Sequence, residues 1–170
     1  MNKIIYLTNL KLKIFTEQNA LDYCQINNIN PLDINELNLK DNQLTDISGI
    51  KLFKNTKYLN LNNNYIIDIS VLKDLNSLEN LDLSYNEITD ISSLKKLKNL
   101  KILQMNVIYI TDISVIKNLN NIEILGINYL NLRSNQIEYI KFLKNLKELN
   151  CINGFKNKSV LSQLNGNIIK

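Results

Sequence analysis

The feature that most restricts how this chain can fold is a short word that recurs at one fixed spacing. Asp-Ile-Ser occurs four times, at positions 46–48, 68–70, 90–92 and 112–114, so that neighbouring copies start 22 residues apart. A constant period of about 20 to 29 residues in a Leu-rich chain is typical of a solenoid, in which each repeat forms one coil of a stack. The sequence therefore predicts stacked coils that share one continuous core.

Aligning the copies brings the aliphatic residues into columns. Two Leu columns lie two residues apart, and an Asn column follows three residues after the second one. Side chains two residues apart point to the same face of a strand, so the Leu columns can be buried only against neighbouring coils. The strands should then pair into a parallel sheet with a spacing of about 4.8 Å. The columns contain Leu59, Leu81 and Leu103, then Leu61, Leu83 and Met105, then Asn42, Asn64 and Asn86.

The polar residues of each repeat have structural roles in such a stack. We expect each Asn of the column to hydrogen-bond the backbone of its own coil and of the next one. We expect the four carboxylates of the repeated word to cap the short helical segments that follow them, because they can accept bonds from free N–H groups. A ladder of bound cations is the alternative, but metal sites need more oxygen ligands per ion. The carboxylates belong to Asp46, Asp68, Asp90 and Asp112.

The pattern Leu-x-x-Leu-x-Leu-x-x-Asn-x-Ile-x-Asp-Ile-Ser-x-Leu can be read from Leu78 to Leu94. It resembles the leucine-rich repeats of the class that includes the internalins of bacterial surfaces and a repeat subunit regulating a Ser/Thr protein phosphatase. The resemblance implies an α/β fold: a right-handed leucine-rich-repeat solenoid with a parallel concave sheet, short 3-10 or α-helical convex segments, and helical terminal caps. It also implies a non-catalytic module that binds a partner protein through the concave face.

This resemblance divides the chain into three parts. Residues 1–30 are expected to form an N-terminal helical cap, and residues 31–155 about five to six coils of leucine-rich repeats. Residues 156–170 are expected to form a C-terminal cap. The caps are needed because a solenoid has to close off the apolar surfaces of its first and last coils.

Each cap is predicted to contain a helix. Thr16 is the expected N-cap of the first helix, and Pro31 is expected to end it. Ser159 is expected to cap the last helix, which should end near Gly166. The residues of the first helix predicted to face the first coil are Ala20, Leu21 and Cys24.

The repeat becomes ambiguous after its fourth copy. One frame, over residues 122–127, continues the spacing of 22 residues, and another, over 127–135, restarts the pattern five residues later. We favour the second frame because the aliphatic residues after Asn135 then follow the repeat, and the extra residues lengthen the convex segment by a helical turn or two. One coil earlier, Ile108 replaces the column Asn, which adds apolar packing but removes an amide. The frames consist of Ile122, Leu125 and Ile127, or of Ile127, Leu130, Leu132 and Asn135.

The composition argues against catalysis. The chain contains no histidine, which removes His-based nucleophile pairs and the common zinc sites. It also lacks a Gly-rich phosphate loop. Cys24 and Cys151 are far apart and fit no metal spacing, so they are predicted to be buried free thiols. We therefore expect no enzyme activity, no cofactor and no metal.

Charge and hydropathy restrict the kinds of partner and the cellular location that we expect. The net charge of +4 is spread thinly, and Lys recurs within the repeats on the expected outer surface, so no nucleic-acid binding is expected. No apolar run approaches the roughly 18 residues that span a bilayer. Free thiols and an N-terminus that reads as mature protein predict a location in the cytoplasm. A parallel sheet with capped ends gives no reason for an oligomer, so a monomer is expected. A secreted or surface internalin-like adhesin or effector is the alternative.

The candidate binding residues alternate with the buried columns or follow them. These positions carry mostly Asn, with aromatic and aliphatic residues in the middle and later coils. Exposed aromatic residues with polar surroundings are typical anchors of protein interfaces, although in a short solenoid they can also merely cover the sheet. In the favoured frame the partner-binding residues are Tyr58, Asn60, Asp82, Tyr85, Ile102, Gln104, Val107, Tyr129 and Arg133.

Overall fold

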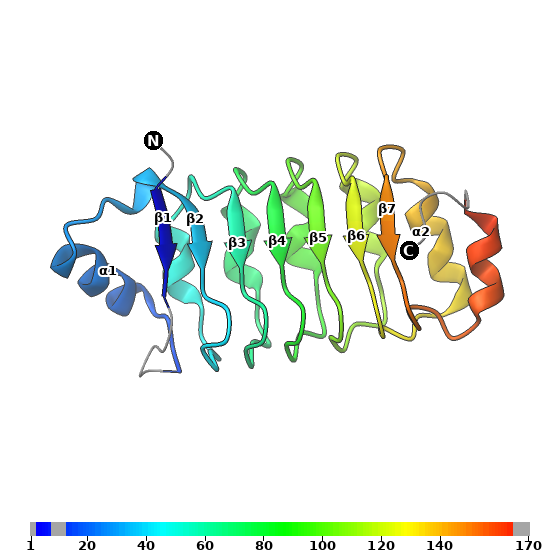
Figure 1. The fold of residues 1–170 in the computed structure, drawn as a ribbon, viewed down its shortest axis with the longest axis horizontal. Helices are drawn as coiled ribbons and strands as arrows, with labels where there is room; N and C mark the ends of the chain where they lie inside the picture. The colour runs from blue at the N-terminus through cyan, green and yellow to red at the C-terminus, as the bar shows by residue number, and fades with distance from the viewer. Residues whose placement is uncertain (1–2, 8–12, 165–170) are drawn as a thin grey trace.

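The computed structural model of the chain describes residues 3–7 and 13–164. Its strands form one parallel sheet in which each strand pairs with the next one along the chain (Figure 1). The strands are β1 (Lys3–Tyr6), β2 (Ile34–Asn38), β3 (Tyr58–Asn60), β4 (Asn80–Asp82), β5 (Ile102–Gln104), β6 (Ile124–Gly126) and β7 (Glu148–Asn150). A parallel sheet without crossings between strands is the arrangement that stacked coils predict.

Short helical segments form a second layer behind the sheet, as Figure 1 shows. Most are single 3-10 turns that return the chain from the end of one strand to the start of the next. They are η1 (Pro31–Asp33), η2 (Ser48–Leu52), η3 (Ser70–Asp74), η4 (Ser92–Lys96), η5 (Ser114–Asn118), η6 (Ser134–Gln136) and η7 (Lys158–Gln163), with α1 (Glu17–Ile26) and α2 (Ile137–Lys141). The predicted α/β solenoid is confirmed.

The core is a spine of aliphatic side chains along the stack. Leu59, Leu81 and Leu103 pair in register on β3, β4 and β5, and none is more than 2% exposed. The second column is buried as well, from Leu39 through Met105 to Cys151. Full burial of a Leu side chain stabilises a fold by about 1.5–3 kcal/mol, so the stacking of coils is the main source of stability.

The Asn column forms a ladder of hydrogen bonds between coils. Asn64 donates from Nδ2 to the carbonyls of Leu39 and Leu61, at 3.0 and 2.9 Å. Its Oδ1 accepts from the backbone N–H groups of Asn42 and Leu44, at 3.1 and 2.9 Å. Asn86 repeats this pattern one coil later. The predicted role is confirmed, but the second coil contacted is the preceding one rather than the next.

The repeated carboxylates accept from a backbone N–H at the start of each 3-10 turn, as predicted, but each Asp is the residue before the N-cap, which is the Ile of the repeated word. In each of the four copies, Oδ1 of the Asp accepts a bond from the backbone N–H of the Ser two residues later, at 2.7–2.8 Å. In the last three copies the Ser hydroxyl also donates to the other carboxylate oxygen. The residue pair therefore closes the start of each turn, where backbone N–H groups have no helical partner.

The N-terminal region adds a strand to the expected helix. Thr16 caps α1 through a 3.2 Å bond from the Asn19 N–H to its hydroxyl, as predicted. Ala20 and Cys24 are buried against the first coil, and Leu21 is half-buried. The strand β1, which was not predicted, extends the sheet before β2.

The end of α1 differs from the prediction. The helix stops at Ile26, and Asn28 adopts a positive φ of 51°, a conformation that ends helices. Pro31 lies beyond this turn and starts η1. At the other end, Asn157 caps η7, so the predicted N-cap Ser159 is wrong. Gly166 lies outside the described residues, and the boundaries at 30/31 and 155/156 stay predictions.

The favoured register after the fourth repeat is wrong. Leu125 pairs with Leu103, so β6 continues the spacing of 22 residues, and the interval to Leu149 on β7 is 24 residues. The two extra residues fall between Leu132 and Ile137, on the side away from the sheet, where η6 and α2 replace a single turn. The sheet fixes its register through paired strands, whereas the convex side accepts insertions at low cost. A longer helical segment was correctly predicted.

Candidate functional site

The outward side of the sheet is a regular surface that runs along the described strands. We call it the sheet face and define it by the residues before and after the buried central residue of each strand. These are Ile4 and Tyr6, Glu36 and Asn38, Tyr58 and Asn60, Asn80 and Asp82, Ile102 and Gln104, Ile124 and Gly126, and Glu148 and Asn150. Between β2 and β5 these side chains alternate with buried Leu, as the sequence predicted.

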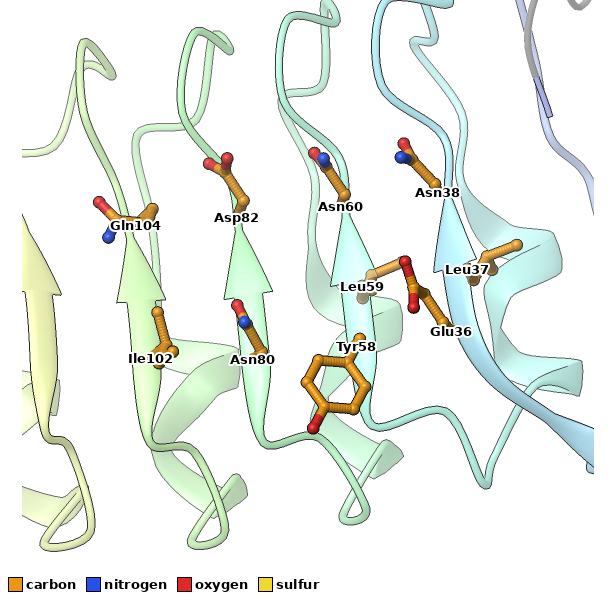
Figure 2. A pocket seen from close by; sticks show the side chains of 10 residues that line it. All are labelled: Glu36, Leu37, Asn38, Tyr58, Leu59, Asn60, Asn80, Asp82, Ile102 and Gln104. Atoms are coloured by element: carbon orange, nitrogen blue, oxygen red, sulfur yellow. The ribbon is translucent and has the colours of Figure 1, made fainter. Parts of the chain in front are cut away.

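A shallow hollow of about 320 Å³ lies on the sheet face over β2 to β5 (Figure 2). Its wall combines amides and carboxylates with the ring of Tyr58, which is 44% exposed, and the half-buried side chain of Ile102. The structure thus brings together five of the nine predicted site residues. The outward lining consists of Glu36, Asn38, Tyr58, Asn60, Asn80, Asp82, Ile102 and Gln104.

Hydrogen bonds hold the polar side chains of the hollow in place. Asp82 accepts from the backbone N–H of Ser84 at 2.9 Å and from Nδ2 of Asn62 at 3.3 Å. Oε1 of Gln104 accepts from Nδ2 of Asn106 at 3.0 Å. The surface therefore presents groups that are already oriented before a partner arrives, which lowers the entropic cost of binding.

Gly126 makes room for this network. A Cβ at this position would lie 1.8 Å from Oε1 of Gln104 and 3.0 Å from Oδ1 of Asn106. Oδ1 of Asn106 also accepts from the backbone N–H of Asn128 at 2.9 Å, and Oδ1 of Asn128 accepts from that of Ile152 at 2.7 Å. From the coil in which Ile108 replaces the column Asn onward, the Asn two residues before the column position thus accepts a bond from the backbone of the next coil.

Three other predicted residues occupy a row of turns at the ends of the strands. We call this the turn row: Asp41, Asn63, Tyr85, Val107, Tyr129 and Asn153, all with φ between 51° and 62°. Asn and Asp tolerate this left-handed conformation, but Val and Tyr adopt it at a cost. The three bulky members, Tyr85, Val107 and Tyr129, are all exposed. The chain therefore keeps apolar surface at positions where the backbone favours Asn.

The predicted positions of Tyr129 and Arg133 depended on the wrong frame. Tyr129 does not precede a buried strand residue, because Ile124 holds that place on β6 and Tyr129 lies in the turn row. Arg133 precedes η6 as an exposed residue and does not belong to the sheet face. Its assignment followed from counting β6 five residues too late.

Sequence reasoning missed a second hollow beside the turn row. It has a volume of about 350 Å³ and is lined by Val107, Tyr109, Tyr129, Asn131 and Lys156, among others. Tyr109 is 69% exposed. Its position in the repeat, two residues after the turn row, is also that of the exposed Tyr65, and comparing this column across coils could have found both.

A ladder of alternating charges borders the sheet face at the starts of the strands. Glu79 accepts from Lys57 at 2.9 Å and from Lys101 at 2.6 Å, and Glu123 accepts from Lys147 at 2.7 Å. The bonds from Lys101 and then Lys57 lower the pKa of Glu79, and that from Lys147 lowers the pKa of Glu123. The bond to Glu79 raises the pKa of Lys101. The ladder joins neighbouring coils at their surface.

The cysteines have the environment of structural thiols. Cys24 and Cys151 are buried and free, as predicted, and burial raises the pKa of both thiols. A raised pKa disfavours the thiolate, which is the reactive form. Among the described residues, no group of three or more His, Cys, Asp or Glu side chains is placed to hold a metal ion.

The repeat architecture matches a known family over most of its coils. Residues 76–121 match the family model described as Leucine Rich repeats (2 copies), and residues 33–88 match the one described as Leucine rich repeat. Together the two matches span more than half of the chain. This chain is a leucine-rich repeat protein. Members of this family generally serve as interaction scaffolds.

Two solved internalins of Listeria monocytogenes resemble this leucine-rich repeat chain. Internalin F (inlF) is 32% identical, over 79% of this chain and 41% of the internalin chain, with a TM-score of 0.69. Internalin C2 (inlC2) is 28% identical, over 83% of this chain and 64% of that chain, with a TM-score of 0.70. The alignments thus span less than two thirds of either internalin chain.

A third structure with a similar fold, PEPR1–AtPEP1, is 25% identical over 61% of this leucine-rich repeat chain and 15% of that chain, with a TM-score of 0.50. No curated protein matches the sequence significantly. None of the helices formed by the described residues has the length and apolar character that crossing a membrane requires.

Proposed function

We propose that this leucine-rich repeat protein is a non-catalytic module that binds a partner protein through the sheet face, with the hollow over β2 to β5 at the centre of the contact. The observation that carries the proposal is the hollow itself. It combines the exposed Tyr58 and the half-buried Ile102 with hydrogen-bonded amides and carboxylates. Aromatic anchors within a polar surround are typical of the residues that dominate binding energy.

The rigidity of the sheet supports this function. The strands β2, β3 and β4 are fixed by the buried Leu columns and by the Asn ladder, so little backbone order has to be gained there on binding. Binding surfaces that are ordered in advance lose less entropy when they meet a partner. The family also supports the proposal, and one structural neighbour was solved as PEPR1–AtPEP1.

Removing the two apolar anchors tests the proposal. We expect Tyr58→Ala with Ile102→Ala to weaken capture of the natural partner at least about a hundredfold, because central anchors each contribute roughly 2 kcal/mol or more. The measurement is affinity capture from the producing cell followed by titration of the identified partner by calorimetry. Ile26→Ala with Phe142→Ala is the matched control, since it removes an exposed Ile and an exposed aromatic outside the sheet face.

A second variant asks whether the contact extends to the turn row. Tyr85→Ala with Val107→Asp removes two of its apolar members, and we expect loss of capture with the circular dichroism spectrum unchanged. Unchanged capture by this variant limits the contact to the sheet face. Unchanged capture by the Tyr58 and Ile102 variant, with normal folding, contradicts the proposed function.

The similarity to two internalins supports a second candidate, a secreted or surface adhesin or effector. The cytoplasmic location expected from the sequence is the competing proposal. Immunoblots of the cytoplasm, the cell surface and the culture medium of the producing cell distinguish them. We further propose that the module acts as a monomer without nucleic acid, which light scattering of the purified protein and its complex can test.

A further inference from the structure

The sheet face carries charge of one sign. Its charged members on the described strands β1 to β7 are Glu36, Asp82 and Glu148, and no outward position that defines this face holds Lys or Arg. The whole chain has the opposite sign, with a net charge of +4. The sheet face is therefore negatively charged, whereas the molecule as a whole is positively charged.

The lysines lie at other places. In η2 to η5 they gather in the last turn, where cations are favourable. These helical segments form the layer behind the sheet (Figure 1), so their lysines lie on the side opposite the sheet face. Lysines at the border of the sheet face belong to the charge ladder, where Lys57 and Lys101 share Glu79 and Lys147 binds Glu123. Lys40, which is exposed two residues after Asn38, pairs with Asp41 at 3.7 Å. These ion pairs reduce the positive charge at the border of the face.

The carboxylates of the hollow keep room for a cationic group. Among the described residues, Glu36 accepts from the hydroxyl of Tyr6, at 3.3 Å, and Asp82 accepts from neutral amide groups. Neither forms an ion pair within the described part of the chain. Tyr58 lies on the strand between them, and Figure 2 shows the Glu36 side chain reaching from β2 toward β3, on the side of this ring. Carboxylates next to an open aromatic face suit Lys or Arg, through ion pairing and cation–π contact.

We propose that the occupant of the hollow is a basic segment of the partner protein, with two Lys or Arg side chains placed on Glu36 and Asp82. This inference rests on the proposed function and names the chemistry of the partner. The carboxylates belong to β2 and β4, which are about 10 Å apart, and Asp82 lies two residues beyond Asn80, the residue in register with Glu36, so the two Cα atoms are roughly 12 Å apart. In a polyproline II segment, residues three apart point the same way about 9.3 Å apart, and the long side chains of Lys or Arg can span the difference, so a basic residue at every third position can reach both carboxylates.

A defined peptide provides the test. The probe is acetyl-Gly-Arg-Pro-Pro-Arg-Gly-amide, titrated to millimolar concentration into the labelled full chain and followed by two-dimensional NMR. We expect shifts of the amide signals around Glu36, Tyr58 and Asp82, and none with the peptide in which Gln replaces both Arg. Glu36→Gln with Asp82→Asn should weaken binding by roughly fivefold to thirtyfold, as expected for two partly exposed ion pairs.

The matched control is Asp22→Asn with Glu138→Gln, which changes the net charge equally at exposed sites outside the sheet face. Equal weakening by both double variants, or no shift on the sheet face with the Arg peptide, overturns the inference. Capture of the natural partner separates the two proposals. If the Glu36 and Asp82 variant leaves that capture intact while the Tyr58 and Ile102 variant abolishes it, the basic partner is wrong and the proposed function stands.

Discussion

At the scale of single residues, the Asn ladder explains why amide side chains are buried beside an aliphatic core. A buried amide such as Asn64 replaces the hydrogen bonds that the backbone would lose at each inward turn. Removing it leaves several buried groups without partners. The ladder is therefore a requirement of the coil and not of a ligand.

We expect Asn64→Ala to lower the free energy of unfolding by about 3 kcal/mol or more, since buried groups lose their bonds on both coils. Guanidinium denaturation followed by circular dichroism measures the change. Asn76→Ala, at an exposed turn on the opposite side, is the control and should change stability by less than about 0.5 kcal/mol. A similar small loss for Asn64→Ala would show that water can replace the amide.

For a substitution in the turn row we predict the opposite effect, a gain in stability. Val107 has a φ of 53°, and a β-branched side chain is disfavoured there. We expect Val107→Asn to raise the free energy of unfolding by about 1 kcal/mol, because Asn tolerates the left-handed region. Val107→Thr keeps the branched Cβ and should give no gain in the same denaturation assay. Equal stabilities of the Asn and Thr variants would count against strain at this turn.

At the scale of elements, the charge ladder links the strands at their starting ends. Hydrogen bonds from lysines hold the pKa of Glu79 below its ordinary value of 4.5, so the stabilisation is present above that pH and is lost as pH falls through the lowered value. The pKa of Lys101 lies above 10.5, so its part persists up to that pH and is lost as pH rises further. The ladder therefore stabilises the fold from about pH 4.5 to 10.5.

We expect Glu79→Gln to lower Tm at pH 7 by no more than about 3 °C, because its lysine partners are half exposed and water screens the pairs. The difference from the unchanged chain should disappear when melting is measured by calorimetry near pH 2. Glu138→Gln, which breaks the exposed pair with Lys141 on α2, serves as a comparison outside the ladder. A Tm difference that persists at pH 2 would assign the effect to packing.

The elements that repeat were predictable from the sequence, and those that depart from the repeat were not. The Leu columns, the Asn amides and the capping Asp residues each occur several times, so a single physical role had to fit every copy. The register of β6 was mispredicted because Ile127, Leu130 and Leu132 mimic the repeat within a loop. Sequence periodicity alone does not distinguish a loop with this pattern from a strand. The pairing of Leu125 with Leu103 in the structure does identify the strand. The strand β1 was missed because it has no counterpart at the repeat spacing.

At the scale of the whole molecule, the candidate site was predicted in part. Alternation along β3, β4 and β5 correctly placed Tyr58, Asp82 and Gln104 on one face. The negative charge of that face was harder to foresee, because it depends on which lysines are bound by Glu79 and Glu123 across coils. Contacts between residues that are 22 or 24 positions apart become visible only once the stack is built.

The constant pairing of β3, β4 and β5 also has an evolutionary consequence. Each coil packs against its neighbours through the same columns of side chains. A coil added by in-frame duplication of one 22-residue unit would therefore pack between two existing coils without further substitutions. Each such event would lengthen the recognition surface by one strand spacing, about 4.8 Å, and a deletion would shorten it equally. A lineage that carries this gene can thus change the length of the recognition surface in steps of one coil, before point mutations change the residues that contact a partner.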